Sequence, residues 1–178
     1  MMNLKRRPVH LIAAVDNKGG FSKNGDIPWY IPEDFKHFKD ITTGNLCLMG
    51  RVTYEDINKR TKNETNVLPN RRSFVVSNTI ESLPNATIVK ELNDIDFNVG
   101  PEDNDTAVYV IGGEKLYDRY IALAIYVHLT VINEDFECDR FFPVDYLMKH
   151  FNLVNVRNCE SDPKVKFFTY LHNKYTQR

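Results

Sequence analysis

The chain has 178 residues, of which 42% are hydrophobic and 26% are charged, and its formal net charge is −1. This is the composition of a soluble globular protein with a sizeable core, and the charge gives no general attraction to nucleic acid or to an anionic membrane. The three cysteines form no C-x-x-C motif, and no apolar segment is long enough to span a bilayer. We therefore expect one domain over residues 1–178, in a reducing, cytoplasmic setting.

Short apolar runs recur along the chain, and several are continuous, as expected of strands buried on both faces. The first follows Lys5-Arg6-Arg7, which we interpret as a solvated terminus. Strands are predicted at residues 9–15, 46–49, 73–76, 87–89, 107–111 and 126–132. Helices are predicted between them at residues 32–41, 53–58 and 114–122. This alternation predicts an α/β fold with a mostly parallel central β-sheet flanked by helices.

The C-terminal part has a different pattern. Residues 151–158 and 165–172 flank Ser161-Asp162-Pro163, which is typical of a turn. We predict a C-terminal antiparallel hairpin at one edge of the sheet. Two polar stretches, residues 59–66 and 93–105, are expected to be exposed loops, with a helical turn possible at residues 92–97.

An acidic residue stands at the start of the first predicted helix. Pro32 suits the first helical position, and from there Asp34, Phe38 and Ile41 fall on one helix face. A carboxylate among aromatic rings holds its proton more readily than one in water, as a proton donor or a polar anchor for an apolar heterocycle would. The alternative is that Asp34 is a helix-terminal charge that favours the helix dipole.

Two strand-to-helix junctions are candidate ligand sites. In Met49-Gly50-Arg51-Val52-Thr53-Tyr54 a buried strand ends in glycine, and free N–H groups with Arg51 could bind an anion. Thr53 could cap this helix or bond a phosphate oxygen. In Val110-Ile111-Gly112-Gly113-Glu114 two glycines allow a ligand to approach the main chain. Either junction could be an ordinary turn, but parallel neighbouring strands would bring both to the edge where open α/β sheets bind ligands.

Other kinds of site have little support in the sequence. Gly20 and Gly25 have the spacing of a phosphate-binding loop, but Asp26 stands where that motif needs lysine. The chain has no G-x-G-x-x-G and no G-x-S-x-G motif. Its five histidines show no metal-ligand spacing, so we expect no metal.

Taken together, these motifs resemble those of the dihydrofolate reductase family over nearly the whole chain. They occur in family order, as Ile12-Ala13-Ala14-Val15, Gly25-Asp26-Ile27-Pro28-Trp29, Pro32-Glu33-Asp34-Phe35, Phe38-Lys39, Met49-Gly50-Arg51-Val52-Thr53-Tyr54, Leu68-Pro69-Asn70-Arg71, Val110-Ile111-Gly112-Gly113, and Asp139 before Phe142-Pro143. The resemblance implies NADPH-dependent reduction of dihydrofolate to tetrahydrofolate for one-carbon metabolism, by a monomer that antifolates would target. It also implies a cis peptide between Gly112 and Gly113.

The resemblance assigns roles to particular residues. It implies that Asp34 is the acid of the pterin pocket, that Trp29 orders a water there, that Thr130 bonds the acid, and that Tyr117 lies near the nicotinamide ring. Arg71 would bind the α-carboxylate of the substrate's glutamate. The remaining substrate positions are Ile12, Ala13, Phe35, Phe38, Ile57, Leu68 and Ile111. The remaining cofactor positions are Ala14, Phe21, Gly50, Arg51, Val52, Thr53, Val76, Ser77, Asn78, Ile111, Gly112, Gly113, Glu114, Lys115 and Leu116.

The chain departs from the family pattern in three places. Gly19-Gly20-Phe21-Ser22 replaces an aliphatic residue followed by glycine, residues 59–66 include an insertion, and Lys115 replaces arginine. Two other functions remain open: a similarly folded reductase of riboflavin synthesis, or a catalytically silent cofactor-binding module. Asp34 behind Trp29, together with Arg71, argues against the first, and the retained Gly112-Gly113 pair argues against the second.

Overall fold

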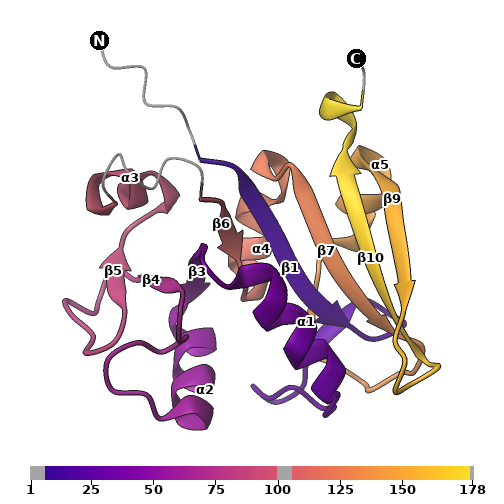
Figure 1. Cartoon of the computed structure of the whole chain (residues 1–178), viewed down its shortest axis with the longest axis horizontal. Helices are drawn as coiled ribbons and strands as arrows, with labels where there is room; N and C mark the ends of the chain where they lie inside the picture. The colour runs from indigo at the N-terminus through magenta and orange to yellow at the C-terminus, as the bar shows by residue number, and fades with distance from the viewer. Residues whose placement is uncertain (1–6, 100–105, 177–178) are drawn as a thin grey trace.

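A computed structural model of the chain describes residues 7–99 and 106–176 (Figure 1). Its main feature is an eight-stranded sheet in the order β5-β4-β3-β6-β1-β7-β10-β9. The strands of this sheet are β1 (Val9–Val15), β3 (Leu46–Gly50), β4 (Arg72–Val76), β5 (Thr87–Val89), β6 (Val108–Val110), β7 (Tyr126–Ile132), β9 (Phe151–Asn158) and β10 (Val165–His172). A second sheet pairs β2 (Gly20–Ser22) with β8 (Arg140–Phe141).

The strand pairing is parallel from β5 to β7 and antiparallel at the other end. All neighbours between β5 and β7 are parallel. The β9–β10 hairpin adds to this sheet through the antiparallel pairing of β10 with β7. The predicted α/β fold, with a C-terminal hairpin at the sheet edge, is therefore confirmed. Apart from the edge strand β5, the parallel strands are largely buried on both faces, which explains their continuous apolar sequence.

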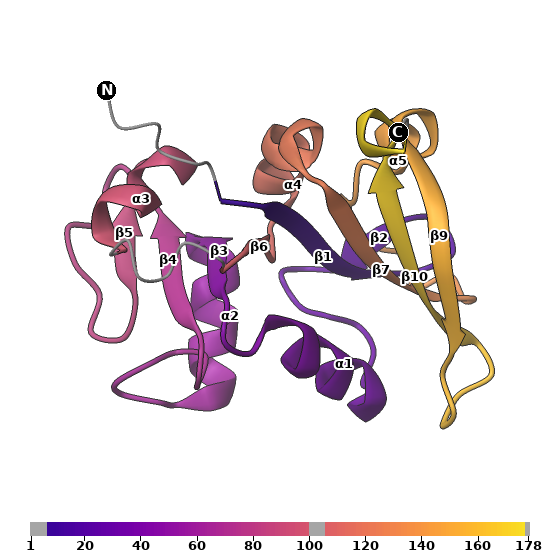
Figure 2. The same ribbon diagram turned by 45° about the horizontal axis from the view of Figure 1, so that its top comes forward.

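Helices cover both faces of the sheet (Figure 2). One face is covered by α1 (Pro32–Thr42) and α2 (Arg51–Thr61), and the other by α4 (Glu114–Tyr120) and α5 (Val144–His150). The alternating side chains of β1 divide between two cores. Leu11 packs with Leu116 and Leu147 on the α4 and α5 side, whereas Ile12 packs with Tyr54 and the half-buried Phe38 on the α1 and α2 side.

The second helix is longer than its predicted range. It begins at Arg51, directly after Gly50, and runs to Thr61 before Lys62 takes a left-handed conformation with φ of 48°. In the last turn, Arg60 pairs with Asp56 one turn earlier, at 3.5 Å, a spacing that supports a helix. The predicted exposed loop at residues 59–66 therefore starts three residues too early, since its first three residues are helical.

Other differences arise from contacts that the sequence pattern does not contain. The prediction missed β2, β8 and α5. The predicted loop at residues 93–105 begins instead with a 3-10 turn (Leu92–Asp94) and α3 (Ile95–Asn98), consistent with the suggested helical turn, and Ile95 is buried in the core. Residues 100–105 lie outside the described part. Arg7 is not solvated: it is buried and pairs with Asp96 at 3.1 Å.

The sheet has a gap beside the end of β1, because its neighbour β6 is shorter. The two strands pair only from Val9 to Leu11, where Leu11 lies opposite Val110. The chain then turns away through Ile111 and a cis peptide between Gly112 and Gly113, as the family resemblance implied. Because β1 continues to Val15, its last residues have no β6 partner. The carboxyl edge of the sheet is therefore open between these strands.

Candidate active site

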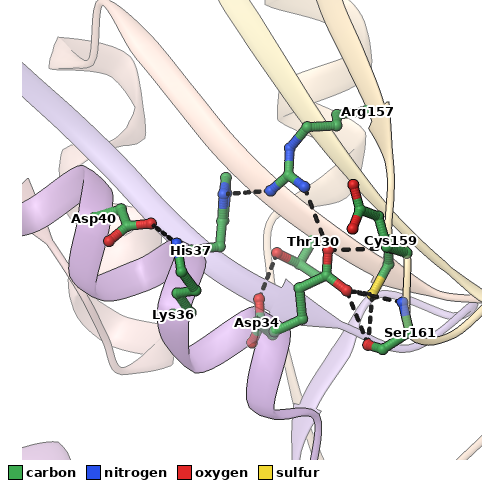
Figure 3. Close-up of polar contacts among 10 residues, drawn as sticks. Asp34, Lys36, His37, Asp40, Thr130, Arg157, Cys159 and Ser161 are labelled. Atoms are coloured by element: carbon green, nitrogen blue, oxygen red, sulfur yellow. Dashed lines mark hydrogen bonds and ion pairs between the residues drawn. The ribbon is translucent and has the colours of Figure 1, made fainter.

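A cleft of about 1120 Å³ follows this opening across the carboxyl ends of the parallel strands. Of the residues predicted to form the site, all but Ser77 and Asn78 line it. Figure 3 shows the polar contacts of α1, where Asp34 points toward Thr130. The cleft joins an acidic, apolar end to an end lined by glycines and cations.

The acidic end is organised by Asp34. The α1 helix begins at Pro32, so Asp34 lies in its first turn, with the carboxylate turned toward the sheet. The hydroxyl of Thr130 on β7 donates to Asp34 Oδ1 over 2.7 Å. Burial raises the pKa of Asp34, and the hydrogen bond from Thr130 opposes that rise only in part. The carboxyl group is therefore held in place by a neutral donor and keeps its proton to a higher pH than it would in water.

Apolar side chains form the walls around this carboxyl group. Phe38 lies one turn of α1 beyond Asp34, and Phe35 is 39% exposed at the opening. Trp29 packs edge-on against Phe136, with ring centroids 5.1 Å apart. The other predicted substrate positions on these walls are Ile12, Ala13, Ile57, Leu68 and Ile111. The space suits a flat ring with one polar edge.

Arg71 places a buried cation farther along the same groove. Its Nε donates to the carbonyl of Pro69 over 3.0 Å, and its Nη1 donates to the hydroxyl of Thr42 over 3.2 Å. The guanidinium carbon lies 5.7 Å from the centre of the Phe38 ring. Burial lowers the pKa of Arg71, and only neutral oxygens satisfy these N–H groups. The guanidinium is preorganised to receive an anionic partner.

The polar loop after α2 is fastened to its surroundings by asparagines. Asn66 Nδ2 donates to the carbonyl of Arg71 over 2.7 Å. Asn63 Oδ1 accepts the N–H groups of Thr65 and Asn66. The amide of the buried Asn85 donates to the carbonyl of Asn63. This loop is an exposed rim, as expected, but its asparagines connect it to the backbone that carries Arg71.

The two glycine junctions meet at the other end of the cleft. Strands β3 and β6 are parallel neighbours, and Gly50 N donates to the carbonyl of Gly112 over 2.8 Å. Gly112 has φ of +132°, and a Cβ there would lie 3.1 Å from Thr53 Oγ1, so this position requires glycine. Thr53 does not cap α2, because the helix begins at Arg51 and Gly50 is its cap residue.

Tyr117 connects this end of the cleft to β1. Its hydroxyl donates to the carbonyl of Ile12 over 2.8 Å, which satisfies a backbone group where β6 has left the sheet. The ring is 3% exposed, and burial raises the pKa of its hydroxyl. Phe21 packs edge-on against it, with ring centroids 5.4 Å apart. The phenol therefore remains neutral and fixes the distance between α4 and β1.

The glycine-rich departure after β1 is explained by close packing. The buried Asp16 accepts the N–H groups of Lys18 and Gly20, so the chain doubles back immediately. A Cβ at Gly20 would collide with Cys138, and Gly19 has φ of +80°. Both positions therefore need glycine, whatever precedes them.

Several residues of the cleft were missed by sequence reasoning. Asp26 and Arg60 face each other from the loop after β2 and from α2, at 3.2 Å. Asp139 accepts the N–H of Asn24 over 2.9 Å. The other missed lining residues are Ser22, Gly25, Ile27, His37, Lys39, Asp56, Thr61, Arg119 and Arg140. The contacts of Asp26 with Arg60 and of Asn24 with Asp139 join residues that are distant in the sequence. The signals for the missed residues were the family motifs that contain Gly25-Asp26-Ile27, Lys39 and Asp139.

Two predicted cofactor positions lie outside the cleft wall. Ser77 and Asn78 follow Val76, which does line it. The hydroxyl of Ser77 already accepts the N–H groups of Thr79 and Ile80, over 3.2 Å each. These contacts form a local turn, and a cofactor group would have to compete with them.

The histidines form no metal centre. In residues 7–99 and 106–176 no group of three or more His, Cys, Asp or Glu side chains could hold a metal ion. His10 Nδ1 lies 3.1 Å from His128 Nε2 on the neighbouring strand, and burial lowers the pKa of each imidazole to about 4. In the same ranges, no helix is long and apolar enough to cross a membrane.

An open parallel sheet with a glycine-lined, cationic cleft at its carboxyl edge is typical of α/β enzymes that bind a dinucleotide. The dihydrofolate reductase profile matches residues 8–176. Dihydrofolate reductase of Bacillus subtilis is 34% identical over 158 residues, covering 88% of this chain and 87% of that protein. The Schistosoma mansoni enzyme is 32% identical over 148 residues, covering 76% and 77%.

A solved structure supports the same relationship. Dihydrofolate reductase from Enterococcus faecalis, complexed with NADP(H) and RAB-propyl, superimposes with a TM-score of 0.77 at 29% identity. The match covers 93% of this chain and 96% of that one. This chain belongs to the dihydrofolate reductase family, and it is an NADPH-dependent oxidoreductase.

Proposed function

We propose that the chain reduces 7,8-dihydrofolate to 5,6,7,8-tetrahydrofolate with NADPH, and that Asp34 supports the protonation of pterin N5. One observation carries the proposal: an acid with a raised pKa lies on the floor of an apolar cleft, held by Thr130 at 2.7 Å. A general acid works best when its pKa lies near the working pH, and burial moves Asp34 in that direction.

The chain's own residues account for binding and orientation of the substrate. Asp34 Oδ1 accepts from Thr130, so Oδ2 is free to accept from the amino group and the N3 edge of a pterin. Phe35 and Phe38 offer ring faces to the pterin and aminobenzoyl groups. Arg71, already oriented by Thr42 and the Pro69 carbonyl, offers its remaining N–H groups to the α-carboxylate.

The glycine end fits the cofactor. Backbone approach is open at Gly50, Gly112 and Gly113, where any side chain at position 112 would reach Thr53 and Tyr117. Free N–H groups at the start of α2, with Arg51 and Lys115, would bind the phosphates. When bound there, NADPH supplies a hydride to pterin C6. Ala14 and Phe21 would orient the nicotinamide, and Trp29 with Asp34 would hold a water for proton delivery.

Absorbance at the nicotinamide band tests the proposal. Mixing protein, NADPH and dihydrofolate should cause a fall in absorbance that requires all three components. A riboflavin-type reductase or a silent binding module would leave the band unchanged with dihydrofolate. We further propose that residues 1–178 act as one domain and as a monomer in the cytoplasm, which sedimentation of the purified protein tests for oligomeric state.

A further inference from the structure

The carboxylate of Glu33, the residue before Asp34, bonds to a different part of the protein. Its Oε2 accepts from Cys159 Sγ over 2.8 Å, from Ser161 N over 2.9 Å and from Ser161 Oγ over 2.8 Å. Its Oε1 accepts from Glu160 N over 3.1 Å. These donors belong to the turn that joins β9 to β10. Glu33 thus connects the first turn of α1 to the tip of the C-terminal hairpin.

Arg157 adds a second attachment from the same hairpin. Its Nη1 lies 3.4 Å from Glu33 Oε1, and its Nη2 lies 3.2 Å from Nδ1 of His37, one helical turn later (Figure 3). The guanidinium carbon lies 4.1 Å from the centre of the Phe167 ring, and the His37 ring lies 4.3 Å from it. Two successive turns of α1 are therefore held against the hairpin.

The register of the sheet relates this attachment to Asp34. Phe167 on β10 lies directly opposite Thr130 on β7 and directly opposite Arg157 on β9. Adjacent strands are about 4.8 Å apart, so Thr130 and Arg157 stand about 10 Å apart in one row. Asp34 bonds to the first and Glu33 to the second. Neighbouring residues of α1 thus fasten the helix at two points of one row.

The Glu33 carboxylate is negatively charged whenever it makes these contacts at working pH. The Glu33 side chain is only 20% exposed, and the hydrogen bond from Cys159, followed by those from Ser161 and Glu160, lowers its pKa to about 2. The carboxylate therefore stays charged across the working pH range. Asp40 on the same helix is different: its side chain is 59% exposed and pairs with Lys36 within the helix, without reaching the hairpin.

We propose that Glu33 is a positioning residue for Asp34, which holds the first turn of α1 so that the Asp34 carboxyl stays against Thr130 on the cleft floor. If the contacts of Glu33 were lost, the hydrogen bond from Thr130 would be the remaining polar attachment of the first turn. The turn would then pivot and admit water to the Asp34 carboxyl. The inference rests on the proposed role of Asp34 as the acid. It adds that the hairpin, on the outer side of the helix, sets where that acid lies.

The test replaces Glu33 with Gln and uses Asp40→Asn as a matched control, because both changes remove one negative charge from α1. The double variant Cys159→Ala/Ser161→Ala keeps the charge of Glu33 but removes its side-chain donors. The single variant Cys159→Ser keeps a donor at this position, because a hydroxyl group replaces the thiol. Each protein is assayed with NADPH and dihydrofolate, and the Asp34 carboxyl is titrated by ¹³C NMR without substrate.

The titration must be interpreted with the neighbouring ionisable groups. Arg157, Cys159 and Glu160 face Glu33 from the hairpin, and His37 lies on its own helix. On the cleft side, Tyr117 interacts with Asp34 electrostatically. Removing the Glu33 charge could itself lower the Asp34 pKa, and the double variant separates that effect from loss of position.

We expect Glu33→Gln and the double variant to lower kcat/KM on the order of tenfold, less than the ~10²-fold effect of a 1 Å misplacement at a reacting centre. Both should move the Asp34 midpoint toward its ordinary value, while Asp40→Asn and Cys159→Ser stay near wild type. The idea is overturned if the double variant titrates like wild type, if Asp40→Asn shifts equally, or if only the melting temperature changes. If Glu33→Gln does not fold, the double variant decides. A wild-type protein that does not turn over refutes the proposed function, whereas the NMR titration still tests the positioning.

Discussion

Replacing Asp34 with Asn tests the centre of the proposed mechanism. The asparagine can still accept the hydrogen bond from Thr130, so the fold and NADPH binding should be kept. Among the residues described, the other carboxylates of the cleft are already engaged: Asp26 and Asp56 with Arg60, Glu114 with Phe141 N and Asp139 with Asn24 N. None can replace the acid.

The expected loss of activity in Asp34→Asn is therefore in the middle of the range for removal of a general acid. Such groups contribute ~10²–10⁴-fold, and a loss of about 10³-fold corresponds to about 4 kcal/mol in the activation barrier. The assay is steady-state oxidation of NADPH with dihydrofolate from acid to neutral pH. The deficit should shrink at low pH, where substrate protonated in solution needs no acid from the protein. Near-normal turnover of Asp34→Asn at neutral pH would refute the assignment.

The same variant gives a stability signature with a defined sign. Burial raises the folded-state pKa of Asp34, so the folded protein binds more protons than the unfolded chain between the two pKa values. Ionising Asp34 therefore destabilises the fold as pH rises through the folded pKa, by about 1.4 kcal/mol per unit of separation. Asp34→Asn should be the more stable protein at neutral pH. The difference should vanish below about pH 3.9, the ordinary value for aspartate.

Two further predictions concern the cofactor and the rim. Arg51→Ala should weaken NADPH binding about tenfold or more, because a hydrogen bond to a charged group contributes roughly 1.5–3 kcal/mol, and should barely change NADH binding. Lys115→Ala should weaken NADPH binding less in the same titration. If Arg51→Ala weakened the binding of NADPH and NADH equally, Arg51 would serve the fold or the shared pyrophosphate. Asn66→Ala should raise KM for glutamylated folates several-fold, because the backbone that carries Arg71 loses its support from the Asn66 amide. The variant also loses the bond from Leu68 N, so two hydrogen bonds of about 1 kcal/mol each should lower the melting temperature by ~4–8 °C. A large thermal loss with unchanged KM would contradict that role.

The elements that sequence predicted well are those whose signal is local. Continuous apolar runs marked the parallel strands, because strands buried on both faces need apolar side chains at every position. Pro32 marked the start of α1, and the two glycine junctions marked the ends of β3 and β6. The pairing of β3 with β6 then brought both junctions to one end of the cleft, as parallel alternation predicts.

The elements that sequence missed depend on distant partners. Strands β2 and β8 are three and two residues long, and each exists because the other lies beside it. Arg7 carries the same charge as its neighbours, yet Asp96 and Thr106 bury it. The predicted cap at Thr53 failed because Gly50 already adopts an extended conformation one residue before the helix.

The sequence by itself determined the order of the parallel strands and of α1, α2 and α4, the acid at the start of α1 and the glycines at the two strand-to-helix junctions, because each depends on the local conformational preference of a few residues. The tertiary structure decided what those groups can do. The pKa of Asp34 rises because the cleft walls exclude water, and its position depends on Thr130, which lies 96 residues away. Glu33 and Asp40 are both acidic residues of α1, but only Glu33 faces the packed hairpin, which places five donor atoms around its carboxylate.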